Sequence, residues 1–394
     1  MKDFWEEQQI EKKKVNKKKI IMSIIILVIV AVLGTVIGVY LNNDSFRDWI
    51  DRNILRKEVM QDNVTTIDLE DSQTANIVAF NRYIGILNKN TFSIYGSSGN
   101  EEASLEVQVS NPLFNSSDRF LAIAENGGKK VYIIENRDIS WQTEVEGNIL
   151  QVVVNKNGYV AIVTEDTINK AVIALYTPQG KQLFNVYLSS TRAVDVSISN
   201  DNKYLAVAEV DTSGTMIKSS IRVISVEKAS SDPTNSVEST YQSENDKLLT
   251  NIKYQDRNKL VCMYTDELRV IEDGQDNLLI DDSDKTLIAE SIELDNYACI
   301  VEEQSSGLFT ANSKVTIIDT NNKETKEYSA ESVAGEIYTN GNIIALNLGT
   351  EVEFINTGGW LVKRYVANQE ITNVVLSQNL AGIVYRDKIE LVSL

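Results

Sequence analysis

The sequence predicts an all-β fold: a β-propeller of eight four-stranded blades, preceded by a single transmembrane helix. Three observations lead to this prediction. A four-residue motif, in which a bulky, an apolar, a small and a second apolar residue follow one another, occurs eight times. The copies lie about 42 residues apart, a spacing typical of repeat proteins. A charge-free apolar run covers residues 20–41. A strand-like segment, Val64 to Leu69, precedes the first copy and belongs to none of them.

Residues 20–41 predict the helix, because about 20 apolar residues suffice to cross the hydrocarbon core of a bilayer. Lysines stand at 12–14 and 17–19, just before the run. The positive-inside rule therefore places the Lys-rich tail, residues 1–19, in the cytoplasm and the rest of the chain outside. A cleaved signal peptide is the alternative, disfavoured because the run is long and no A-x-A-like site follows it. We expect a single-pass cell-membrane protein that contacts the lipid bilayer through residues 20–41.

Residues 42–62 are expected to hold a juxtamembrane amphipathic helix and a linker. Phe46, Trp49, Ile50 and Ile54 recur at helical spacing, and Ser45 with Asp48 fits a helix cap. Such a helix either lies on the outer membrane surface or packs against the main domain. The sequence leaves both possibilities open.

Residues 63–394 are predicted to form the extracytoplasmic propeller. The small residues of the eight motif copies are Gly85, Ala122, Ala161, Ala206, Cys262, Cys299, Ala345 and Gly382. A second short segment rich in β-branched residues follows each motif, and polar turns flank the motif and this segment. Each copy is therefore predicted to form four antiparallel strands. The small residue fits the second strand, where neighbouring sheets pack too closely for a large side chain. A seven-bladed ring is the alternative, and an open solenoid is disfavoured because its repeats are usually shorter.

The eighth copy ends at Leu394, after its third strand. If Val64 to Leu69 supplies the fourth strand, the ring closes and leaves no long sheet edge exposed. The loops between second and third strands lengthen in copies 4 and 6. Leu308 and Phe309, at the tip of the copy 6 loop, form either a contact surface or a loop folded onto its own blade. Residues 229–246, rich in Ser, Asp and Glu, are expected to be a mobile excursion.

Composition excludes several classes of function. The net charge is −18, and a nucleic-acid partner would need a basic face. The chain has no histidine, which removes Ser-His-Asp and Cys-His catalysis and the usual zinc sites. Asp281-Asp282-Ser283-Asp284 is the densest acidic cluster, but it lacks the order of a calcium loop and reads as a solvated connection between blades. Cys262 and Cys299 read as small buried residues, with an inter-blade disulfide as the alternative.

Two resemblances to known families follow from these motifs. Gly180-Lys181-Gln182-Leu183-Phe184 resembles the turn and fourth strand of quinoprotein-type (PQQ-like) propeller repeats, and Ile139-Ser140-Trp141 and Gly359-Trp360-Leu361 match it in part. The layout of nearly the whole chain resembles a family of uncharacterised, membrane-anchored Gram-positive β-propellers, a domain of unknown function. These resemblances suit eight blades and supply no catalytic residues, and nothing in the sequence marks a bound quinone or its metal.

No catalytic, cofactor-binding or metal-binding residue is therefore assigned, and no cofactor is expected. The favoured hypothesis is a non-enzymatic interaction module at the cell envelope, with an envelope protein or a cell-wall glycan as its partner. The alternative is a carboxylate-based hydrolase or lyase acting on surface polysaccharide, which requires an acid pair facing the channel. A ligand sensor that signals inward is a third possibility. The oligomeric state is not predicted.

Overall fold

The computed structural model describes residues 17–43, 46–47, 50–51, 54–55, 57–61, 64–69, 75–243, 247–305 and 311–394. The chain divides into two compact units, Met1–Glu58 and Val59–Leu394. Each unit is described by itself below.

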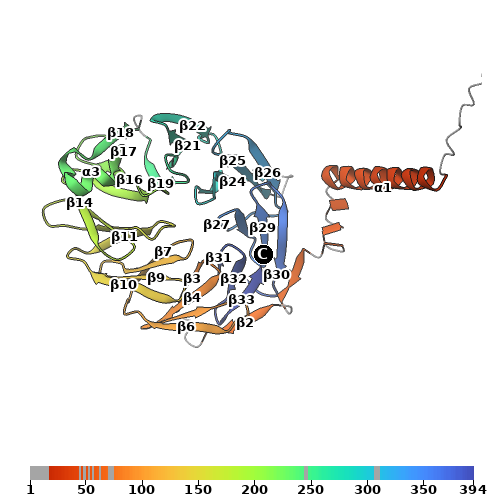
Figure 1. The fold of residues 1–394 in the computed structure, drawn as a ribbon, viewed down its shortest axis with the longest axis horizontal. Helices are drawn as coiled ribbons and strands as arrows, with labels where there is room; N and C mark the ends of the chain where they lie inside the picture. Colours follow the sequence, from red (N-terminus) through yellow and green to blue (C-terminus); the bar gives the residue numbers. More distant parts are fainter. Residues whose placement is uncertain are drawn as a thin grey trace, which may run out of the picture. The chain divides into compact units, whose positions relative to one another are not determined.

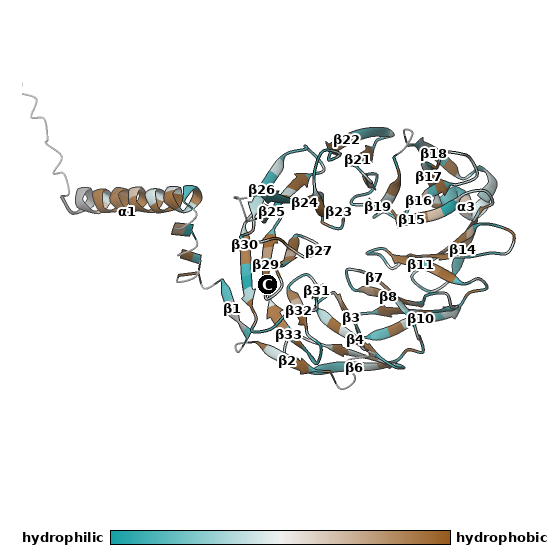
Figure 2. Cartoon of the chain, turned by 180° about the vertical axis from the view of Figure 1, so that it is seen from behind, coloured by the Kyte–Doolittle hydropathy of each residue, from teal (hydrophilic) through white to brown (hydrophobic). Residues whose placement is uncertain are grey.

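The first unit contains one long helix, α1 (Lys17–Asn42). Its segment Met22–Asn42 has a mean hydropathy of 3.0 and is long enough to span a membrane, a property shared by spanning helices and signal sequences. Most residues of this segment are apolar (Figure 2). The hydroxyl of Thr35 donates a hydrogen bond to the carbonyl of Ala31 (2.9 Å), so this polar group is satisfied within the helix.

The segment after α1 is partly helical, at 46–47 and 50–51. The backbone N–H of Phe46 donates to the side chain of Asn43 (2.9 Å), so Asn43 acts as a cap here. Asp51 is buried, accepts a hydrogen bond from the Tyr40 hydroxyl (2.7 Å) and pairs with Lys57 (3.0 Å). The predicted Ser45, Asp48 and Trp49 lie outside the described residues, so the amphipathic helix stays a prediction.

The second unit is a propeller in which eight antiparallel sheets of described residues surround a centre (Figure 1). Blade one consists of β3 (Ala75–Phe80), β4 (Tyr83–Asn88), β5 (Thr91–Tyr95) and β6 (Glu101–Glu106), and blade two of β7 (Pro112–Ser117), β8 (Phe120–Glu125), β9 (Lys130–Glu135) and β10 (Asp138–Glu144). Blade three consists of β11 (Ile149–Val154), β12 (Val160–Thr164), β13 (Ala171–Tyr176) and β14 (Gln182–Leu188), and blade four of β15 (Arg192–Ile198), β16 (Tyr204–Asp211), β17 (Lys218–Ser225) and β18 (Val237–Gln242). Blade five consists of β19 (Leu249–Tyr254), β20 (Leu260–Tyr264), β21 (Glu267–Glu272) and β22 (Gln275–Asp281), and blade six of β23 (Leu287–Ser291), β24 (Tyr297–Ser305), β25 (Ala311–Asp319) and β26 (Thr325–Ser329). Blade seven contains β27 (Glu336–Asn340), β28 (Ile343–Asn347), β29 (Glu351–Asn356) and β30 (Leu361–Val366), and blade eight consists of β31 (Asn373–Leu376), β32 (Leu380–Val384), β33 (Lys388–Ser393) and β2 (Thr65–Asp68).

The propeller has two faces, which follow from the antiparallel order of its strands. Turns from first to second and from third to fourth strand lie on one face, called here the turn face. Hairpins from second to third strand and connections between blades lie on the opposite face, called the loop face. The first strand of each blade lies nearest the centre, as β7, β11 and β19 show in Figure 1.

The N-terminal strand closes the ring, as predicted. β2 pairs antiparallel with β33, with Thr65 opposite Leu391 and Asp68 opposite Lys388. The eighth blade therefore takes its outermost strand from the N-terminal end of the propeller, and the seven-bladed alternative is wrong. Because both ends of the domain share one sheet, separating the first blade from the eighth requires breaking this strand pair.

A further strand, β1 (Glu58–Met60), lies beside β30 and gives the seventh blade five strands. It falls within the predicted linker, and no pattern in the sequence indicates it. Next to it, the Gln61 amide donates to Glu390 (2.9 Å), and its carbonyl accepts from the Asn368 backbone N–H (3.0 Å). This single side chain thus connects the start of the propeller to its last strand and to the seventh-to-eighth blade connection.

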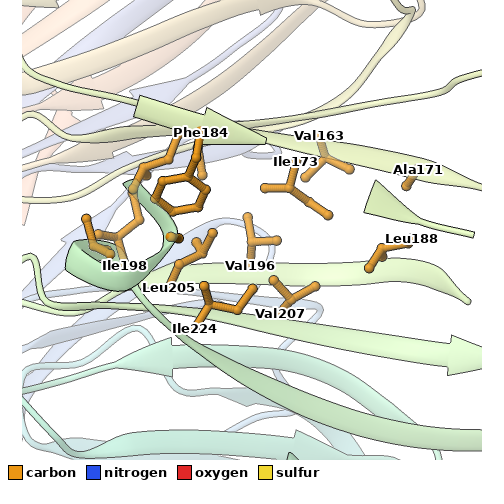
Figure 3. Packing of buried hydrophobic residues seen from close by; sticks show 14 residues of the cluster. Val163, Ala171, Ile173, Phe184, Leu188, Val196, Ile198, Leu205, Val207 and Ile224 are labelled. Carbon is orange, nitrogen blue, oxygen red and sulfur yellow. The ribbon is translucent and has the colours of Figure 1, made fainter. Parts of the chain in front are cut away.

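Apolar side chains from facing sheets fill the spaces between blades. Figure 3 shows this packing between the third and fourth blades, where Phe184 and Ile173 meet Val196 and Leu205. The predicted reason for the small residue on the second strand is confirmed at Gly382. A Cβ there would lie 2.9 Å from Val375 of its own blade and 3.3 Å from Ile84 of the next blade.

Two third-to-fourth-strand turns carry a glycine that contacts the preceding blade, a feature the sequence did not predict. Gly180 has a φ of +77°, and a Cβ on it would lie 2.9 Å from the indole of Trp141 on β10. Gly359 has a φ of +78°, and a Cβ on it would lie 3.0 Å from the backbone oxygen of Glu327 on β26. These are residues of the PQQ-like motifs, so those motifs mark points where the outer edges of neighbouring blades touch.

Residues 229–246 were wrongly predicted as a mobile excursion. The described part holds the end of helix α3 (Val226–Ser231), the 3-10 turn η2 (Pro233–Asn235) and the fourth strand, β18. The hydroxyl of Ser225 caps α3 by accepting from the Lys228 backbone N–H, and Val226 and Ala229 are buried in the apolar cluster between blades three and four. Burial of two apolar residues within a polar stretch explains the ordered helix. Leu308 and Phe309 lie outside the described residues.

Candidate functional site

The propeller encloses a recess of about 800 Å³ where the first strands end on the turn face. Every blade contributes to its wall, through residues that include Asn81, Ser116, Asn155, Asp195, Gln255, Glu293, Asn340 and Gln378. The volume lies within the range of about 300–1,000 Å³ typical of ligand pockets. Amide, hydroxyl and carboxyl groups are prominent in this wall, so the recess suits a polar occupant.

Much of this polar wall holds the blades together. A first strand is an edge strand, and its unpaired backbone N–H groups need partners. Side chains of the preceding blade supply them: Asn115 accepts from the Val154 backbone N–H (2.8 Å), and Ser197 accepts from the Tyr254 backbone N–H (2.8 Å). The neighbouring blade therefore protects the edge of each of these two strands.

Side-chain amides bridge further blade junctions through backbone carbonyls. The Gln255 amide of the fifth blade donates toward the carbonyls of Leu294 (3.0 Å) and Tyr297 (2.6 Å) in the sixth. The Asn340 amide of the seventh blade donates to the Leu376 carbonyl of the eighth (3.0 Å). The wall thus serves as a ring of inter-blade hydrogen bonds, as well as a surface open to a ligand.

Asp195 is the most perturbed carboxyl of the recess wall. One oxygen accepts from the Gln151 amide of the third blade (2.6 Å) and from the Val196 N–H (2.8 Å), and the other accepts from the Ile252 N–H of the fifth blade (2.8 Å). Burial raises the pKa of Asp195 to about 6, against the opposing effect of these hydrogen bonds, and Glu293 raises it further. Asp195 therefore joins three blades at one carboxyl group.

The recess carries an excess of negative charge. Its wall contains the carboxyl groups of Asp118, Asp195, Asp256, Glu293 and Asp295 and the ammonium groups of Lys156 and Lys253. Lys253 forms an ion pair with Glu293. This balance favours a cationic or neutral polar occupant over an anionic one.

The other residues considered in the sequence lie away from the recess. Cys262 on β20 and Cys299 on β24 are both buried and free, which confirms the small-residue prediction. Burial raises the pKa of Cys299 to about 12, so its thiol is unreactive at neutral pH. In the acidic cluster, Asp281 and Asp284 are exposed but Asp282 is buried, so the prediction of a solvated connection is wrong for Asp282.

The sequence did not single out the recess residues. Asp195, Gln255 and Glu293 come from three blades, and about 40–60 residues separate consecutive members. The sequence feature that could have indicated them is a polar residue near the end of the first strand of a blade. In a propeller, this end of the first strand lies next to the central recess. That feature is common to many strands and does not identify a ligand.

The geometry defines an eight-bladed β-propeller with a polar, acidic recess, together with an apolar N-terminal helix. By sequence, the chain belongs to a family of unknown function, DUF5711, whose model matches residues 56–394. No curated protein matches the chain by sequence.

Solved structures that resemble the chain are propellers of low sequence identity. BamB from Moraxella catarrhalis is 13% identical, with a TM-score of 0.49 over 84% of this chain and 99% of that one. Apo AztD from Citrobacter koseri is 10% identical, with a TM-score of 0.47 over 81% and 90%. The dihydro-heme d1 dehydrogenase NirN is 12% identical, with a TM-score of 0.50 over 84% and 73%. At these identities the likeness shows the fold alone.

Proposed function

We propose that this protein is a non-enzymatic interaction module, held by its N-terminal helix on the outer face of the cell membrane. The recess would bind a polar, neutral or cationic segment of an envelope protein or a wall glycan. The observation that carries the proposal is the recess itself, which is acidic and lined by all eight blades. The lysines before the apolar helix support the outward orientation.

The environment of Asp195 supports a binding role over catalysis. A catalytic carboxyl group needs an oxygen free to meet the substrate. Both Asp195 oxygens already accept hydrogen bonds from neighbouring blades, and the group is only 8% exposed. Its raised pKa follows from burial at a structural junction.

A photo-reactive amino acid introduced in intact cells tests the proposal. We would place it at Asp118 and at Asp256, both exposed at the recess, and at Ser213, exposed on the loop face, as the matched control. The proposal expects a discrete adduct from the two recess positions and none from the control. Adducts that wall hydrolases digest would identify a glycan, and the others a protein. The same adducts from all three positions, or none from any, would contradict recess binding.

A carboxylate-based hydrolase or lyase is the second candidate. It is favoured by one observation, the raised pKa of Asp195 beside Glu293 in the same recess. This candidate predicts that purified protein releases new ends from surface polysaccharide, and that both Asp195→Asn and Glu293→Gln abolish the release. Under the interaction proposal the wild type releases none.

A further inference from the structure

Two carboxyl groups approach each other where the fifth blade connects to the sixth, on the loop face away from the recess. Asp282 directly follows β22, and its backbone N–H donates to the Asp266 carbonyl (3.1 Å). Glu290 lies on β23, the first strand of the sixth blade. The two carboxyl groups are within hydrogen-bonding reach of each other. When both are ionised, however, they are two acceptors with no proton between them.

The oxygens of this pair are buried without partners. Asp282 is 2% exposed, and neither of its carboxyl oxygens has a hydrogen-bond partner. Oε1 of Glu290 is buried and unpartnered as well. Buried carboxylates in proteins are paired or bind metals, because losing hydration without compensation is costly. This pair therefore requires a further positive group.

The cations nearby are engaged elsewhere. Lys247 pairs with Glu267 (2.5 Å) and Lys314 pairs with Glu327 (2.7 Å), whereas Lys285 lies 4.0 Å from Glu302. Among the described residues, neither Asp282 nor Glu290 has a basic partner in an ion pair. Burial and then Asp282 raise the pKa of Glu290, and no basic group acts against them. The compensating charge must come from solution.

A shared proton does not satisfy the pair. One proton between the two carboxyl groups joins two oxygens, whereas three are buried and unpartnered. A divalent cation placed between the two carboxylates would offer a partner to all three oxygens and would neutralise both charges. We propose that Asp282 and Glu290 form a binding site for a divalent cation between the fifth and sixth blades.

The donors indicate which cation fits. They are hard oxygen atoms, and both oxygens of Asp282 are bare, which suits the bidentate carboxylate coordination of Ca²⁺. Mg²⁺ demands a stricter octahedron and retains its waters. Zn²⁺ prefers nitrogen and sulfur, and the neighbouring thiol of Cys299 is protonated. Among the described residues, no group of three or more metal-ligating side chains occurs, so water and backbone carbonyls would complete the shell. Ca²⁺ is therefore the favoured ion.

Calcium titration of the full chain in detergent, stripped first with a chelator, tests the site. Isothermal titration with CaCl₂ should give one site per chain. Saturating CaCl₂ should raise the Tm of the wild type by about 5 °C, and MgCl₂ by clearly less. Asp282→Asn and Glu290→Gln should each abolish the rise. Asp284→Asn, in the same connection but exposed, should retain it.

Two outcomes would overturn the proposal. One is the absence of calcium binding to the folded wild type, whether or not the variants fold. The other is an equal rise in Tm for the wild type and both site variants. In the first case, a greater stability of Asp282→Asn than of the wild type would show that the pair holds a proton rather than a cation. Either single-site variant suffices for the comparison if the other fails to fold.

Discussion

Replacement of Asp195 by asparagine isolates the energetic role of the carboxyl group that joins three blades. In the folded protein burial raises its pKa from 3.8 to about 6, so the folded state binds this proton more tightly than the unfolded state. The stabilisation is therefore fully present below pH 3.8 and is lost as the pH rises through 6. The shift corresponds to about 3 kcal/mol in total, of which about 1 kcal/mol falls between pH 5 and 7.5.

The amide introduced by Asp195→Asn does not titrate, so this pH dependence disappears in the variant. Its NH₂ group would also face one of the N–H donors that the carboxylate accepts, at a cost of about 1–3 kcal/mol. Urea unfolding of the full chain in detergent at pH 5 and 7.5 measures both effects. The free energy of unfolding of the wild type minus that of the variant should be about 1 kcal/mol larger at pH 5 than at pH 7.5.

Asp201→Asn is the matched control. Partial burial opposes ionisation of Asp201, but hydrogen bonds from Ser199 and Lys203 hold its pKa below 3.8. The contribution of ionised Asp201 to stability is present above pH 3.8 and is lost only in more acidic solution. The dependence of unfolding free energy on pH between 5 and 7.5 should therefore be the same for Asp201→Asn and the wild type. A difference between wild type and Asp195→Asn that is constant with pH, or larger at pH 7.5, would refute the reasoning.

Three further predictions concern other parts of the fold, and each is tested by urea unfolding. Arg364→Met removes the basic partner of the 1% exposed Glu353 carboxylate, which among the described residues keeps only the hydrogen bond from Tyr328, and should cost about 3–5 kcal/mol. Arg119→Met, at an exposed ion pair, should cost about 1 kcal/mol or less. Gly180→Ala adds a Cβ at positive φ against the indole of the preceding blade, and should cost about 1–3 kcal/mol. Thr65→Pro removes the backbone N–H that faces Leu391 in the strand pair that closes the ring, and should cost about 1–3 kcal/mol; an unchanged midpoint would contradict closure by β2.

The architecture was predictable because one packing constraint recurs in every blade. The second strand of each blade packs against neighbouring sheets, so residues such as Gly382 must be small. A small residue accordingly recurs eight times in the sequence. Closure by β2 was predictable because the last copy lacked a strand. β1 was missed because it is three residues long, lies outside the repeat and depends on an edge that only the assembled seventh blade provides.

The candidate sites were not predictable, because each depends on register between blades. Gln151, Asp195 and Ile252 meet only after three repeats are placed side by side. In the acidic cluster, the sequence cannot show that Asp282 turns inward while Asp281 and Asp284 stay exposed. The same composition supports both a solvated loop and a buried carboxyl pair.

The central claim is that the N-terminal helix displays the propeller outside the cell, and labelling of an introduced cysteine tests it most directly. Cys262 and Cys299 are fully buried, so the wild type is an unlabelled blank. Ser213→Cys places a thiol on an exposed hairpin of the fourth blade. A membrane-impermeant maleimide should label this variant in intact cells as completely as in lysed cells. Labelling only after lysis would place the propeller inside and contradict the account.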